Sequence, residues 1–198
     1  MGVAGFRASL RAQVVVLVVA ALVAGMGAVI WSRTIAGEGD ATELIRLGDA
    51  GEYVDPALVN PDRTGEPLPD VRVATADGER IRLQPDGLPM VVNVWTSTCG
   101  PCSRELTYFA RVADDRAGQV RFVGVDPLDD AERMVDFAAQ RGVTYELLRD
   151  DEYELFDALD LVSFPATLFV AADGTVVAQT GEVSETELRE HVDALLDA

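Results

Sequence analysis

The hydrophobic and polar positions in the second half of the chain follow strand-like and helix-like patterns in turn. Residues 90–95 and 120–125 are nearly continuous apolar runs, which predicts two strands buried on both faces of a sheet. Residues 71–75 and 80–83 instead alternate between apolar and polar positions. Because an Asp-Gly pair at 77–78 lies between them, these two segments predict a β-hairpin.

The remaining segments supply helices and further strands. A helix is predicted over residues 100–115, soon after the first buried strand. Gly142 marks the end of a second helix, over residues 129–141. Ser184 and Glu187 form a capping-box pattern at the start of the last helix. A short helix at 152–159 and strands at 145–149, 166–171 and 175–179 complete the set. Strands that alternate with helices predict an α/β fold, with a central mixed β-sheet flanked by helices and an N-terminal β-hairpin.

An uncharged stretch lies near the N-terminus, over residues 14–31. As a helix it spans about 27 Å, close to the ~30 Å hydrocarbon core of a bilayer. Arg7 and Arg11 precede it, so the positive-inside rule predicts a cytoplasmic N-terminus and an extracytoplasmic remainder. A cleaved signal peptide is the alternative, but its apolar region usually runs for only about 7–15 residues, and no Ala-x-Ala site follows here. We therefore predict a single N-terminal transmembrane helix that is retained in the lipid bilayer.

Composition divides the chain into three parts. Residues 1–34 form the cytoplasmic stub and the transmembrane signal-anchor helix. Residues 35–64 are rich in Gly, Asp, Glu and Pro, which predicts an extracytoplasmic linker. Residues 65–198 hold the predicted strands and helices and form the globular domain.

The chain is acidic, with a formal net charge of −18 at pH 7. Its 16 basic residues are all arginine, and residues 1–37 contain no acid. The acidic remainder argues against binding to nucleic acid or docking on anionic lipid. Two interpretations of the excess acid remain open: a solvated surface, or a docking face for a basic partner protein.

The candidate chemistry lies in Cys99-Gly100-Pro101-Cys102, which holds the only 2 cysteines of the chain. The pair follows a predicted buried strand and opens a predicted helix, where proline is tolerated in the first turn. The positive end of a helix dipole lowers the pKa of a nearby thiol, so we assign Cys99 as the nucleophile. Cys102 lies one turn further in and is predicted to be the more buried, resolving thiol.

Two other uses of the cysteine pair fit poorly. Zinc needs four ligands, and the only histidine, His191, is expected on the surface of the last helix. A purely structural disulfide across so short a loop gives little stabilisation. We therefore expect redox exchange through a Cys99–Cys102 disulfide, with no metal and no further cofactor.

Residues 92–105, with the sequence VNVWTSTCGPCSRE, resemble the active-site segment of the thioredoxin superfamily, and more narrowly that of the TlpA/ResA-like membrane-anchored thioredoxins. The resemblance covers residues 64–197 and includes the SFPAT segment at 163–167. It implies a thioredoxin-like fold and thiol–disulfide oxidoreductase activity. In this superfamily the proline of the second segment is cis and packs against the disulfide, which implies a cis Phe164–Pro165 bond. The backbone of Phe164 would then be free to pair with an extended substrate segment.

The resemblance also implies roles for residues around the cysteines. Glu105 lies one helical turn past Cys102 and matches a glutamate that tunes the thiols and aids partner recognition; an exposed helix residue is the alternative. Asn93 stands where cytoplasmic thioredoxins have a buried aspartate, and it cannot titrate. Trp95 matches a tryptophan that packs under the site. Thr98 departs from the family, which usually has an aromatic residue directly before the first cysteine.

Two functions use these cysteines in opposite directions. The resemblance implies a membrane-tethered reductase that serves exported proteins, either in cytochrome c maturation, with apocytochrome c as substrate, or in disulfide repair. Such a reductase needs electrons from a membrane carrier of the DsbD/CcdA type. The alternative is an oxidase that donates disulfides to exported proteins. Gly100 and Pro101 resemble those of thioredoxin and favour the reductase.

Two further classes fit less well. The pattern Thr96-x-x-Cys99 occurs in thiol peroxidases, but the proline expected four residues before the threonine is Val92 here. A copper chaperone of the Sco type would need cysteines separated by three residues and a histidine near the site, and the sequence has neither.

Overall fold

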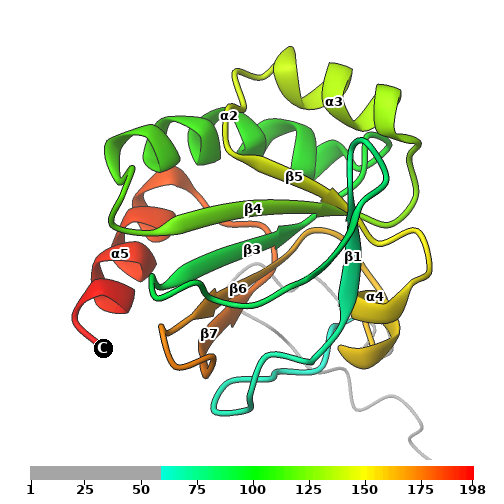
Figure 1. Cartoon of the computed structure of the whole chain (residues 1–198). Coiled ribbons are helices and arrows are strands. Elements are labelled where there is room, and N and C mark those ends of the chain that lie inside the picture. The colour runs from blue at the N-terminus through cyan, green and yellow to red at the C-terminus, as the bar shows by residue number, and fades with distance from the viewer. Residues whose placement is uncertain (1–58) are drawn as a thin grey trace, which may run out of the picture. The chain divides into compact units, whose positions relative to one another are not determined.

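The computed structural model describes residues 59–198 (Figure 1). The predicted membrane helix at residues 14–31 and most of the predicted linker lie outside this range, so both stay predictions. Among residues 59–198, no helix has the length and apolar character needed to cross a membrane.

One mixed sheet of 7 strands runs through the domain in the order β2-β1-β5-β4-β3-β6-β7. β4 pairs in parallel with both β3 and β5, and all other neighbours pair antiparallel. The strands are β1 (Arg72–Thr75), β2 (Arg80–Arg82), β3 (Met90–Val94), β4 (Arg121–Asp126), β5 (Glu146–Arg149), β6 (Ala166–Val170) and β7 (Val176–Thr180). The predicted α/β fold with a mixed sheet and a leading hairpin is confirmed.

Helices cover both faces of this sheet, as predicted (Figure 1). They are α2 (Gly100–Asp115), α3 (Ala131–Ala139), α4 (Glu154–Ala158) and α5 (Glu185–Leu196). Val91, Phe122 and Phe169 come from three adjacent strands and pack with apolar residues of α2 and α5. Their sequence neighbours, such as Val92, point to the opposite face and pack with Leu155 of α4. Burial on both faces explains why β3 and β4 are apolar runs in the sequence.

Two helices are shorter than the sequence patterns predict. α3 begins at Ala131 rather than residue 129, because the Asp130 side chain caps it and accepts a hydrogen bond from the Arg133 backbone N–H at 2.9 Å. α4 begins at Glu154 rather than residue 152, because Tyr153 before it has a φ of 59°, outside the helical region.

Residues 59–67, called the strap below, pack along β7. The Arg63 backbone N–H donates to Gln179 Oε1 at 3.1 Å, and Gln179 Nε2 donates to the Pro61 carbonyl at 2.8 Å. Further along, the Gly65 N–H donates to the Val176 carbonyl at 2.8 Å. Pro61 and Arg63, which composition assigns to the linker, therefore contact the edge strand of the sheet.

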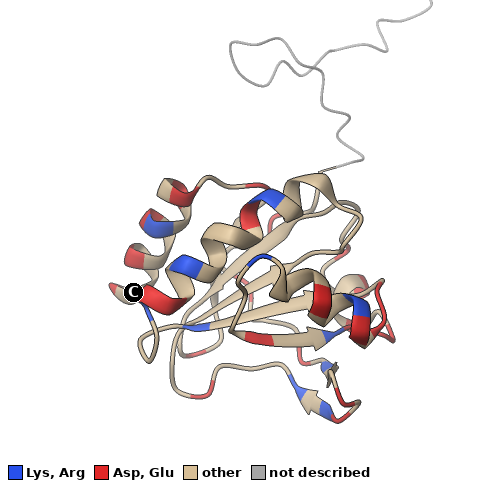
Figure 2. Ribbon diagram, turned by 90° about the horizontal axis from the view of Figure 1, so that it is seen from above, with Lys and Arg blue, Asp and Glu red and all other residues tan. Residues whose placement is uncertain are grey.

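Acidic and arginine residues are interspersed along the same helices and loops of the ribbon (Figure 2). Glu185, for example, forms ion pairs with both Arg111 and Arg189. Charges mixed in this way favour the solvated surface over a single acidic docking face.

Gly124 of β4 makes room for the indole of Trp95. A Cβ atom at this glycine would lie 2.7 Å from Trp95 Nε1 and 3.0 Å from Leu147 Cδ2. Only a residue without a side chain lets the tryptophan approach the strand this closely. The sheet therefore fixes the position of Trp95, which precedes the cysteine segment by a few residues.

Candidate active site

The two cysteines form a disulfide at the N-terminus of α2, with 5.3 Å between their Cα atoms. Cys99 is the N-cap residue, and its Sγ accepts a hydrogen bond from the Cys102 backbone N–H at 3.1 Å. Cys99 is half-buried and follows the exposed Thr98, whereas Cys102 is fully buried. The prediction that Cys102 is the more buried sulfur is confirmed. An N–H group directed at Sγ, together with the helix dipole, stabilises a thiolate at Cys99 in the reduced protein.

The Asp129 carboxylate fixes the loop that joins β3 to the cysteines. Its Oδ2 accepts hydrogen bonds from the Ser97 N–H at 2.7 Å and from Thr96 Oγ1 at 3.2 Å, and its Oδ1 accepts one from Ser97 Oγ at 2.8 Å. Arg133 of α3 pairs with the same carboxylate at 2.9 Å. Thr96 is buried and its hydroxyl proton goes to Asp129, so it is not available to position a peroxide at Cys99. This contact argues against the thiol peroxidase.

Asp126, the last residue of β4, is wholly buried and contacts Asp129. Its Oδ1 accepts hydrogen bonds from the N–H groups of Leu128 and Asp129, at 2.8 and 3.0 Å. Burial and the hydrogen bond to Asp129 raise the pKa of Asp126 to about 7. Burial acts to raise the pKa of Asp129 as well, but hydrogen bonds from Asp126 and Ser97 outweigh it and lower that pKa. The acid pair therefore holds a proton on Asp126 below about pH 7, while Asp129 stays charged.

The sequence patterns did not lead us to this acid pair, although they contain a signal for it. β3 and β4 are parallel neighbours, so residues that follow their carboxyl ends meet at one edge of the sheet. Thr96 and Ser97 follow β3, and Asp129 follows β4. When two strands predicted to be parallel neighbours are both followed by polar residues, those residues are expected to lie together at one edge of the sheet.

A buried polar network joins β3, α2 and β6. Asn93 Nδ2 donates to Glu105 Oε1 and to Thr167 Oγ1, each at 2.9 Å. Glu105 is 0% exposed, so the alternative of an exposed helix residue is wrong. Burial raises the pKa of Glu105 to about 7, although the hydrogen bond from Asn93 acts in the opposite direction. A carboxyl group that titrates near neutrality thus lies one helical turn from Cys102.

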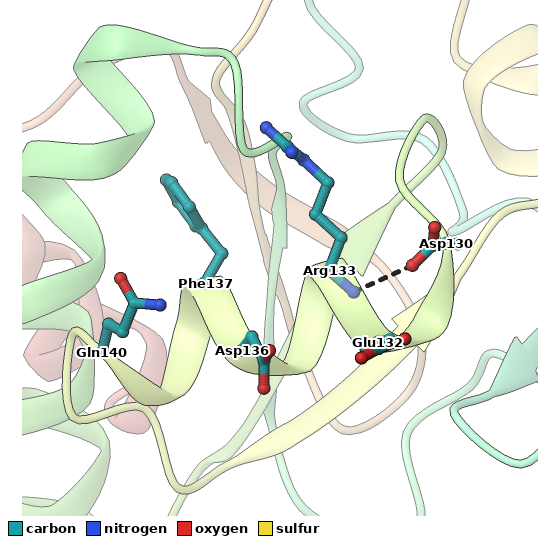
Figure 3. A pocket seen from close by; sticks show the side chains of 6 residues that line it. All are labelled: Asp130, Glu132, Arg133, Asp136, Phe137 and Gln140. Atoms are coloured by element: carbon teal, nitrogen blue, oxygen red, sulfur yellow. Dashed lines mark hydrogen bonds between the residues drawn. The ribbon is translucent and has the colours of Figure 1, made fainter.

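Trp95 connects the cysteines to α3. Its indole is buried in one apolar cluster with Cys102, as the family resemblance implies, and stacks on Phe137 with 5.7 Å between ring centroids. The Arg141 guanidinium lies 3.4 Å from the Phe137 ring centroid and donates to Ser103 Oγ at 2.8 Å. Figure 3 shows Phe137 extending from α3, where it lines a pocket of about 440 Å³. These contacts hold α3 against the start of α2.

The Phe164–Pro165 peptide bond is cis, as the family resemblance implies. β6 starts directly after it, and Ala166 pairs with Val94 of β3. The cis bond therefore lies beside the end of the strand that leads to the cysteines. Phe164 also packs against the apolar cluster that includes Cys102. The structure thus places Phe164 beside the cluster that contains the disulfide, and its role in substrate docking stays a prediction.

His191 differs from its predicted surface position, because it is only partly exposed and stacks on Phe169 of β6 with 4.7 Å between ring centroids. In the part of the chain that the structure describes, no group of 3 or more His, Cys, Asp and Glu side chains is placed to hold a metal ion.

Comparison with known proteins agrees with this geometry. Residues 63–196 match the Redoxin family. The chain is 28% identical over 152 residues to the thiol:disulfide interchange protein DsbE of Pseudomonas fluorescens biotype C, covering 75% of this chain and 84% of the relative. It is 25% identical over 134 residues to the thiol-disulfide oxidoreductase ResA of Bacillus subtilis, covering 66% of this chain and 75% of the relative. A crystal structure of a secreted Mycobacterium tuberculosis disulfide oxidoreductase homologous to E. coli DsbE superposes with a TM-score of 0.54 at 30% identity, covering 64% of this chain and 96% of that chain.

Proposed function

Since the chain belongs to the Redoxin family, in the TlpA/ResA-like group of the thioredoxin superfamily, we propose that it is a membrane-anchored, extracytoplasmic reductase of protein disulfides. That it is a thiol–disulfide oxidoreductase follows from the relatives named for this activity and from its Cys99–Cys102 pair. The asymmetry of the pair, with a half-buried Cys99 at a helix N-terminus and a fully buried Cys102, supports exchange chemistry in either direction. The observation that carries the reductase direction is the Gly100-Pro101 sequence between the cysteines, which resembles that of thioredoxin.

The proposed reaction begins with the reduced enzyme. The Cys99 thiolate attacks one sulfur of a substrate disulfide, so a mixed disulfide forms and one substrate thiolate leaves. The Cys102 thiol then loses its proton and attacks Cys99, which releases the second substrate thiolate and leaves the Cys99–Cys102 disulfide. The substrate gains two electrons, which the two enzyme sulfurs lose; the proton of Cys102 passes to an acceptor on the enzyme, and the two substrate thiolates take up protons from the solvent. A membrane dithiol carrier of the DsbD/CcdA type restores the reduced enzyme.

Neighbouring residues support the two sulfurs in this proposal. Glu105, held by Asn93, is the acceptor for the proton that Cys102 must lose, because its pKa lies near neutrality. Trp95 packs beneath the pair, and Gly100 and Pro101 set its potential in the direction of thioredoxin. Thr98 and the backbone of Phe164 meet the substrate segment.

Exported proteins with disulfides are the proposed substrates, and apocytochrome c is the specific candidate. The support is the likeness to a protein named as a thiol:disulfide interchange protein and to one named as a thiol-disulfide oxidoreductase, in a chain with an apolar stretch at residues 14–31.

The reduction potential of the cysteine pair tests the direction of the reaction. We expect a value below about −220 mV against a glutathione buffer, because known pairs span from about −270 mV in thioredoxin to about −120 mV in the oxidase DsbA. The measurement is equilibration of the full-length protein with glutathione, followed by thiol alkylation and mass analysis. A reduction potential near −120 mV would indicate an oxidase and contradict the proposed reductase.

The cellular location of the full-length chain tests the anchor. We expect it in the membrane fraction, resistant to extraction by alkaline carbonate, with residues 65–198 digested by protease added from outside. A variant that lacks residues 1–34 serves as the control and is expected to stay in the cytoplasmic fraction. If mass analysis placed the N-terminus of the mature protein after residue 31, the segment would be a cleaved signal peptide instead.

A further inference from the structure

The strap is attached to two parts of the active-site side of the domain. Its backbone at Pro61 and Arg63 forms the two hydrogen bonds with Gln179 of β7 described above. Its first residues also reach the loop at residues 162–165, called the docking loop below, which ends in the cis Phe164–Pro165 bond. The strap and the docking loop are separated by about a hundred residues in sequence and meet only through tertiary structure.

Asn60 makes this second contact with its whole side-chain amide. Its Oδ1 accepts hydrogen bonds from the N–H groups of Val162 and Ser163, at 2.8 and 3.0 Å. Its Nδ2 donates to the Ser163 carbonyl at 3.0 Å. Within residues 59–198, neither Val162 nor Ser163 has a hydrogen bond to another main-chain group. One side chain therefore supplies the backbone partners that a strand or helix would otherwise give this loop.

The contact borders open space next to the cis bond. A pocket of about 310 Å³ has Val59, Asn60 and Asp62 of the strap as one wall, and Ser163 and Pro165 of the docking loop as another. Pro165, which forms the cis bond with the predicted docking residue Phe164, is part of this lining. The strap thus faces the same space as the docking loop.

From these contacts we propose that Asn60 is a positioning residue for substrate docking, which holds the docking loop in the conformation that receives the substrate segment. The proposal rests on the proposed function, because it takes Phe164 as the docking residue. A loop fixed before binding spares the complex the entropy of ordering it. Asn60 does not contact the cysteines in this arrangement, so it acts on substrate affinity and not on sulfur chemistry.

The test compares a protein substrate with a small disulfide, using the full-length chain. In Asn60→Ala, we expect KM for a protein disulfide to rise about tenfold, the equivalent of about 1.4 kcal/mol, with kcat changed less than about twofold. Turnover of oxidised glutathione and the reduction potential are expected to stay unchanged. Asn60→Asp keeps the acceptor for the two N–H groups but loses the donor, and we expect an intermediate KM. Gln119→Ala, which removes an exposed amide side chain after α2, is the matched control.

Hydrogen exchange gives a second measurement that needs no substrate. We expect the Val162 and Ser163 amide protons to exchange about tenfold faster in Asn60→Ala than in the unsubstituted protein, because their acceptor is gone. The proposal would be overturned if Asn60→Ala reduced turnover of the protein disulfide and of oxidised glutathione equally. It would also be overturned if hydrogen exchange at the Val162 and Ser163 amides were unchanged. A low activity of the unsubstituted protein with both substrates would instead count against the reductase, and the exchange rates would still decide the role of Asn60.

Discussion

Cys99→Ser is expected to abolish thiol–disulfide exchange, whereas Cys102→Ser is expected to stop the reaction at a covalent enzyme–substrate complex. Cys99 is the accessible sulfur at the helix N-terminus, so its loss removes the nucleophile, with a decrease in rate of at least about a thousandfold. Cys102 is fully buried and reaches only Cys99, so without it the mixed disulfide has no intramolecular thiol to resolve it.

The measurement is turnover of a protein disulfide, followed by non-reducing electrophoresis and mass analysis of the trapped species. Cys102→Ala is the control, since it removes the thiol without adding a hydroxyl and should trap the same complex. Normal turnover by Cys102→Ser, or trapping by Cys99→Ser through Cys102, would reverse the assignment of the two sulfurs.

Glu105→Gln is expected to change how the stability of the oxidised protein depends on pH. The pKa of Glu105 is raised in the fold to about 7 from its ordinary value of 4.5, so the folded state binds the proton more tightly than the unfolded state. The contribution of this proton binding to the free energy of unfolding is therefore fully present below about pH 4.5 and is lost as pH rises through about 7. This difference between the folded and unfolded pKa of Glu105 changes the free energy of unfolding by about 3 kcal/mol between low and high pH.

We expect the free energy of unfolding of the unsubstituted protein to fall between pH 4.5 and 8, and this decrease to be smaller by up to about 3 kcal/mol in Glu105→Gln. Denaturant unfolding at several pH values measures it. Asp126, whose pKa is also about 7, contributes a decrease of the same sign, so part of the slope should persist until Asp126→Asn is added. Glu190→Gln, an exposed change on α5, is the matched control. Identical pH profiles for Glu105→Gln and the unsubstituted protein would show that Glu105 is not held in a desolvated site.

Sequence patterns predicted much of the fold because the turns, caps and strand ends concerned are determined by residues that are close together in the chain. The hairpin at β1 and β2 follows from alternation around an Asp-Gly turn, and the capping box of Ser184 and Glu187 is present as expected. The cysteine pair opens α2 because a buried strand ends just before it. In each case, residues within a few positions of one another determine the structure.

The parts of the site that the sequence did not predict depend on residues that are distant in the chain. Asp126 and Asp129 meet the loop before Cys99 only because β3 and β4 are parallel neighbours. Asn60 meets the docking loop across a separation of 103 residues. Helical spacing places Glu105 near Cys102, but its complete burial depends on how the whole of α2 packs on the sheet. No periodicity or cap signal carries this information.

The hydrogen bond between Asn93 and Thr167 also has a consequence for folding specificity. These two residues are directly opposite in the antiparallel pair of β3 and β6, within strands that are otherwise apolar. A slip of the pairing by two residues would place the Asn93 amide opposite Phe169 or Pro165, with no hydroxyl to accept its hydrogen bond. The two polar side chains therefore select one alignment of the strands, and that same alignment sets the cis bond beside the strand that leads to the cysteines.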